Sequence, residues 1–138
     1  MKRIISFQFA ATGSIVIYGV FIFFHFAIIL GILFFNFVPI DYLWGGRLQS
    51  REQFLVFEII SLLIQSICLF LTLIKAKYLK LSKLETVAHV GMWILFGIFL
   101  LNTVGNVFAK TYFEKMFAFV TAILAILTLR LAIDKRTV

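Results

Sequence analysis

The side chains that could do chemistry are polar groups placed inside long apolar runs. Glu58 lies about one helical turn inside such a run, where an unpaired carboxylate is costly. We expect it to be ion-paired, protonated or exposed to a water-filled cavity, and Arg47, Arg51 and Lys110 are the candidate cations. The simplest role is a structural ion pair or hydrogen-bond network between helices. A ligand-binding or proton-handling carboxylate is the functional alternative.

Two asparagines, Asn102 and Asn106, lie four residues apart near the end of another apolar run, with Gly105 beside them. A helix of 3.6 residues per turn places all three on one face. Amides within a hydrocarbon layer are costly unless they are hydrogen-bonded. We therefore expect this face to meet Glu58, an arginine or a bound ligand.

His25 falls near the middle of the first apolar run. A histidine at this depth can relay protons, or it can form a hydrogen bond between helices, which is the simpler interpretation. His25 and His89 lack the spacing of a metal-ligand set, and no phosphate-binding loop or nucleophile elbow is present. The sequence predicts no metal site, no cofactor and no catalytic residue.

Four apolar runs must position these groups. The chain of 138 residues is 63% hydrophobic with 18 Phe and a mean hydropathy of +1.10, far more apolar than soluble domains. The runs lack the two-residue alternation of barrel strands, so helices are expected. We predict one domain over residues 1–138, an all-α integral membrane antiparallel four-helix bundle. Its expected spans are 14–36, 54–74, 88–109 and 116–133.

The cationic residues set the expected orientation. Nine of the 13 Lys and Arg residues lie at the N-terminus, between the second and third runs, or at the C-terminus; four lie in the other two loops. The excess of positive charge on cytoplasmic loops then predicts that both termini are cytoplasmic. Because topology explains the net charge of +7, the lipid bilayer and not nucleic acid is the expected partner.

Polar residues gather in the external half of this arrangement. The cytoplasmic half is expected to hold almost no buried polar group except Gln8, Thr72 and His89. A path through the membrane needs polar lining in both halves, so the asymmetry favours a pocket open to the external side. We expect the loop from Trp44 to Arg47 to cover it. The predicted ligand-binding residues are Trp44, Arg47, Arg51, Glu58, Asn102, Asn106 and Glu114.

Small residues and a charge pair mark the last run. Alanines at 118, 122, 125 and 132 form a stripe that would allow close helix packing within the bundle or, alternatively, a homodimer. Arg130 and Asp134 lie four residues apart near its cytoplasmic end and are expected to pair or to reach the interface.

Three short motifs carry a resemblance. Trp44-Gly-Gly-Arg47 follows the first run, Asn102-Thr-x-Gly-Asn106 closes the third, and Glu114-Lys115 opens the fourth. In these motifs the chain resembles a group of small bacterial four-helix membrane proteins for which we know no function. The resemblance implies a multi-pass protein of the bacterial inner membrane and adds no activity, substrate or partner.

Three functions follow from these patterns. The first is binding of a small or amphiphilic ligand, such as a lipid or isoprenoid, or of a membrane partner, with the guanidinium of Arg47 available to an anionic head group. The alternative is transport, by a proton-coupled carrier or channel-like dimer that uses Glu58 and His25. The third is a membrane enzyme acting on a lipid with Glu58 as acid or base; it ranks lowest because no second catalytic group can be identified.

Overall fold

A computed structural model describes residues 5–39, 42–44 and 48–135. Over these residues the chain is helical and contains no strand. The elements are α1 (Phe7–Phe35), α2 (Arg51–Lys75), the short 3₁₀ helix η2 (Ser82–Leu84), α3 (Glu85–Val107) and α4 (Tyr112–Ala132). All four α-helices are long and apolar enough to cross a membrane, which confirms the prediction of an all-α chain with four helices of membrane-spanning length.

Local side chains determine where three of the helices begin. The oxygens of Ser6, Ser50 and Thr111 each accept a hydrogen bond from a main-chain N–H three residues further on, as N-cap residues do. Ser50 therefore fixes the start of α2 through its side chain. α1 begins before the expected residue 14 and ends at Phe35. Its C-cap Asn36, whose φ of 50° is left-handed, lies three residues before Pro39.

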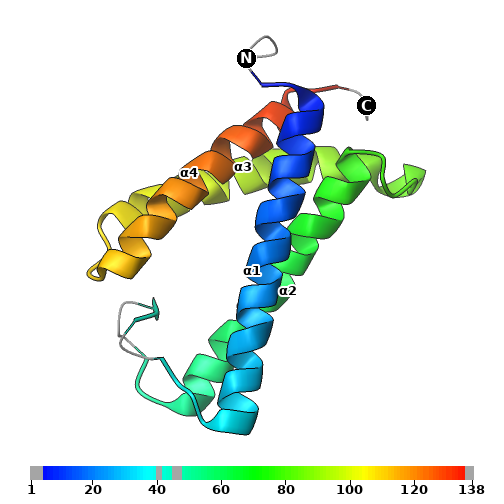
Figure 1. Ribbon diagram of the computed structural model, residues 1–138. Helices are drawn as coiled ribbons and strands as arrows, with labels where there is room; N and C mark the ends of the chain where they lie inside the picture. Colours follow the sequence, from blue (N-terminus) through cyan, green and yellow to red (C-terminus); the bar gives the residue numbers. More distant parts are fainter. Residues whose placement is uncertain (1–4, 40–41, 45–47, 136–138) are drawn as a thin grey trace.

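The helices pair as two antiparallel hairpins, α1 with α2 and α3 with α4 (Figure 1). The hairpins meet where α1 begins and α4 ends, and they diverge toward the connections α1–α2 and α3–α4. We call these the closed end and the open end. The V-shaped divergence is absent from the sequence-based prediction, because the apolar runs define helices but not the angle between them.

The buried apolar core lies toward the closed end. α4 is more deeply buried than the first two helices, with nine of its 21 residues buried against eight of 29 in α1 and six of 25 in α2. The alanines at 118, 125 and 132 are all buried, so this stripe packs inside the chain. Large apolar side chains such as Phe23, Phe34 and Phe119 cover the outer faces and are exposed, as expected for surfaces that face lipid.

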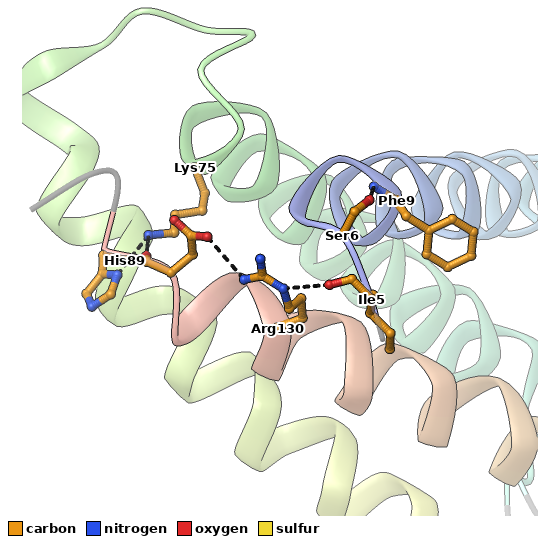
Figure 2. Close-up of polar contacts among 7 residues, drawn as sticks. Ile5, Ser6, Phe9, Lys75, His89 and Arg130 are labelled. Atoms are coloured by element: carbon orange, nitrogen blue, oxygen red, sulfur yellow. Dashed lines mark hydrogen bonds and ion pairs between the residues drawn. The ribbon is translucent and has the colours of Figure 1, made fainter. Parts of the chain in front are cut away.

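Buried charges tie the four helices together at the closed end (Figure 2). Lys75 Nζ lies 2.9 Å from His89 Nδ1 and donates to the main-chain oxygen of Asp134 at 2.6 Å. Arg130 pairs with the Asp134 carboxylate at 3.1 Å and donates to the main-chain oxygen of Ile5 at 2.8 Å. We refer to Lys75, His89, Arg130 and Asp134 as the charged cluster.

The charged cluster tests two expectations. The pairing of Arg130 with Asp134 is confirmed. The expectation that the cytoplasmic half holds almost no buried polar group is wrong, because Lys75, Arg130 and Asp134 are at most 5% exposed. Counting charges assigned Lys75 to a loop, whereas it is the last residue of α2 and faces the interior.

Candidate functional site

A cavity of about 330 Å³ lies between the hairpins toward the open end. All four helices and the α1–α2 connection contribute to its wall. The polar lining consists of His25, Trp44, Glu58, Ser61, Gln65, Asn102, Asn106, Glu114 and Thr121. The apolar lining consists of Phe21, Phe24, Leu43, Ile64, Phe99 and Phe117. This volume falls at the small end of the range for pockets that bind small molecules.

Glu58 is the most deeply buried charged group in the cavity wall, at 1% exposure. Its Oε2 lies 2.6 Å from His25 Nδ1, and its Oε1 accepts a hydrogen bond from Trp44 Nε1 at 2.9 Å. Each carboxylate oxygen therefore has a partner from a different element. Burial of a carboxylate is tolerated when its oxygens are satisfied in this way.

The partner of Glu58 differs from the cations considered in the sequence. Arg51 donates instead to the main-chain oxygen of Ile32 at 2.8 Å, and Lys110 forms no ion pair with Glu58. Arg47 lies outside the described residues. Sequence reasoning names His25 together with Glu58 in the transport alternative but not as the partner of the carboxylate. Similar depth links them, since His25 lies ten residues before the end of α1 and Glu58 seven after the start of α2.

The contact between His25 and Glu58 requires a proton between the two atoms. The proton can belong to imidazole or to the carboxyl group, and the second imidazole nitrogen stays available to the cavity. The side chain of His25 is 14% exposed and that of Glu58 is 1% exposed. The pair can thus accept or release a proton on the cavity side without breaking the contact between helices α1 and α2.

Trp44 anchors the α1–α2 connection over the cavity. Besides its bond to Glu58, its ring packs edge-on against Phe57 with 5.0 Å between centroids. Its φ of 57° is left-handed, which costs on the order of 1 kcal/mol for a non-glycine residue. The side-chain contacts offset that cost. The loop from Trp44 to Arg47 is the segment expected to cover the pocket. Trp44 forms part of the cavity wall, and Arg47 lies outside the described residues.

Asn102 and Asn106 share one face of α3, as predicted, and both line the cavity. Among the described residues, neither side-chain amide forms a hydrogen bond with protein. Gln65 Oε1 is buried in the same wall and also lacks a partner there. These three amides present donors and acceptors to whatever occupies the cavity.

The remaining predicted residue, Glu114, has a local role as well as a place in the wall. Its Oε2 accepts a hydrogen bond from the Thr111 hydroxyl at 2.9 Å, and its main-chain N–H donates to that hydroxyl at 3.2 Å. This reciprocal pairing fixes the start of α4. Five of the seven predicted residues, namely Trp44, Glu58, Asn102, Asn106 and Glu114, therefore line one cavity.

In the part of the chain that the structure describes, no group of three or more His, Cys, Asp and Glu residues is placed to hold a metal ion. Comparison of the chain with protein-family models, curated proteins and solved structures gives no match. The site is therefore interpreted from its own chemistry: a buried carboxylate–imidazole pair and three unpaired amides in a wall rich in aromatic rings.

Proposed function

We propose that the chain is a multi-pass membrane protein that binds a small or amphiphilic molecule in the cavity between its hairpins. Four helices of membrane-spanning length and their exposed apolar faces support insertion into a bilayer. The bias of positive charge supports cytoplasmic termini, and the resemblance noted above supports the bacterial inner membrane.

One observation carries the binding proposal. The cavity combines the buried Glu58–His25 pair and the unpaired amides of Asn102 and Asn106 with an apolar wall. Ligand sites combine polar groups in fixed positions with apolar side chains, so that the polar groups orient one part of the ligand and the apolar side chains contact the rest. A volume near 330 Å³ equals roughly ten water molecules at about 30 Å³ each, enough for a head group or a compact amphiphile.

Co-purification tests the proposal. The wild type, Glu58→Gln and Asn102→Ala are purified from membranes in a mild detergent, and bound molecules are identified by native mass spectrometry. We expect a bound species in the wild type and its loss from both variants. Glu52→Gln is the matched control, because Glu52 is exposed on the first turn of the same helix. It should retain the species.

The opposite result has a clear meaning. The same bound species in the wild type and in both cavity variants would contradict the proposal. The proposal would also be contradicted if the wild type carries no bound species and Asn102→Ala and Asn106→Ala only lower the unfolding temperature. The polar groups would then be structural contacts within the bundle.

A further inference from the structure

The interior face of α2 is polar along almost its whole length. Six residues at spacings of three and four share this face: Glu58, Ser61, Gln65, Cys68, Thr72 and Lys75. Four of them are at most 2% exposed, namely Glu58, Cys68, Thr72 and Lys75. From Glu58 to Lys75 the helix rises about 25 Å, close to the roughly 30 Å of a hydrocarbon core. We call this row the α2 seam.

α1 supplies two further polar groups to the middle of the molecule. Ser14 and Tyr18 lie one turn apart on α1, and both are 0% exposed. Tyr18 belongs to the same buried cluster as Cys68. Its ring stacks on Phe99 with 6.0 Å between centroids, and Phe99 lines the cavity. Tyr18 therefore lies just beyond the cavity, on the way to the closed end.

Ser14 Oγ and Gln65 Oε1 are buried and have no hydrogen-bond partner among the described residues. Tyr18 Oη is buried as well and interacts with the Thr72 side chain of α2, but without ordinary hydrogen-bond geometry. Buried polar groups are normally paired, and each exception calls for a reason. Alanine, phenylalanine and leucine would fill these positions without leaving a polar atom unsatisfied. Water molecules between α1 and α2 would satisfy all three, since buried water binds groups of this kind.

Titratable side chains lie in contact with one another at both ends of the seam. At the cavity end, Glu58 contacts His25, with Trp44 donating from the connection. At the closed end, Lys75 of α2 contacts His89 of α3, and Asp134 and Arg130 complete the surroundings. Histidine is the side chain whose ordinary titration falls nearest to neutral pH, and each end has one.

We propose that the α2 seam is a proton path that connects the cavity with the charged cluster. A proton binds at the Glu58–His25 pair, passes through water held by Gln65, Tyr18 and Ser14, and leaves from the Lys75–His89 pair. Only O–H and N–H bonds form and break, and every group returns to its first state. An electrochemical proton gradient drives net movement in either direction. The path rests on the membrane insertion proposed above but not on ligand binding.

The buried Lys75 and Ser14, together with the expected Thr72, give the closed end a polar lining. The asymmetry that disfavours a through-membrane path in the sequence is therefore absent from the structure.

Proton flux in vesicles tests the path. The protein is reconstituted into liposomes that contain a pH-sensitive dye, and a potassium diffusion potential drives proton entry. We expect the wild type to change the internal pH faster than protein-free vesicles do. Tyr18→Phe and Gln65→Leu should reduce the flux to the protein-free rate. Gln65→Leu removes a buried amide oxygen that has no protein partner among the described residues, and Tyr18→Phe keeps the ring that stacks on Phe99, so both should fold.

Two matched variants control for general leakage. Ser66 follows Gln65 on α2 but is exposed and bonds only to its own helix; Tyr112 is 88% exposed. Ser66→Ala and Tyr112→Phe should therefore keep the wild-type flux. Circular dichroism and unfolding temperatures of all variants identify any loss that comes from misfolding.

Three outcomes would overturn the path: a wild-type flux equal to that of protein-free vesicles, an unchanged flux in folded Tyr18→Phe and Gln65→Leu, or an equal loss in the exposed controls. The result is independent of the binding test. If a molecule is bound but no proton flux is measured, the binding proposal stands and the proton path is eliminated. If proton flux is measured but no molecule is bound, the path stands and the binding proposal is eliminated.

Discussion

Glu58 joins three parts of the chain through a single side chain. It lies on α2, contacts His25 on α1 and accepts a hydrogen bond from Trp44 in the connection between these helices. A buried charge pair adds little to stability compared with apolar residues of the same volume, but removing one partner leaves the other without compensation. The arrangement of the cavity wall therefore depends on both members of the pair being present.

A double-mutant cycle measures this dependence. His25→Ala should destabilise the protein by about 3–5 kcal/mol, because Glu58 Oε2 stays buried without its partner. Glu58→Ala together with His25→Ala should cost less than the sum of the single changes, with a coupling of about 0.5–3 kcal/mol. Equilibrium unfolding in mixed micelles provides the free energies.

The control for this cycle is the Lys77–Glu85 pair at the closed end, where the side chain of Lys77 is 43% exposed. Glu85→Ala should change the unfolding free energy by no more than about 1 kcal/mol. Strict additivity of the His25 and Glu58 substitutions would show that their contact contributes no coupling.

At the scale of helices, the sequence patterns predict where a helix lies and how long it is. They predict less well which residues of two helices touch. The apolar runs locate all four helices. The partner of Glu58 was missed because periodicity determines which face is polar but not how far a neighbouring helix is rotated. Equal depth on two helices joined by one connection would have suggested His25. The polar face that holds Glu58, Gln65 and Thr72 reaches Lys75 three residues beyond Thr72.

The approach of α3 to α2 depends on a glycine, which allows a test at this scale. Gly91 is buried, and a Cβ added there would lie 2.9 Å from Leu71 Cδ1 on α2. Gly91→Leu should destabilise the protein by about 1–3 kcal/mol, as expected of an overpacked contact. Thermal unfolding in detergent measures the change.

Gly97, on the same helix, is the matched site, because a Cβ there meets no atom within 4 Å. Gly97→Leu should leave the unfolding temperature unchanged or raise it, since leucine favours the helix more than glycine does. Equal destabilisation at both sites would mean that close packing at Gly91 does not hold the hairpins together.

At the scale of the molecule, the two ends are held by different interactions. The charged cluster and the buried apolar core join the hairpins at the closed end. At the open end the hairpins diverge around the cavity (Figure 1). The sequence predicts neither the angle nor the cluster, because both depend on which residues of distant helices meet. Movement of one hairpin relative to the other should therefore be larger at the open end.

Distances between spin labels test this difference in movement. In a Cys68→Ser background, labels at Phe35→Cys and Tyr112→Cys report on the open end, and labels at Phe9→Cys and Val87→Cys report on the closed end. All four native side chains are more than half exposed, so labels there should not disturb the core. Pulsed electron resonance should give a broader distance distribution for the open-end pair than for the closed-end pair.

The same labels show whether the charged cluster is what restrains the closed end. Arg130→Gln removes the cation that pairs with Asp134 and changes the donor to Ile5, and unpaired buried groups favour local opening. We expect the closed-end distribution to broaden in this variant while the open-end one changes little. If the closed-end distribution stays as narrow as in the wild type, the apolar core alone holds the hairpins, and the cluster is free to serve the proton path without a structural role.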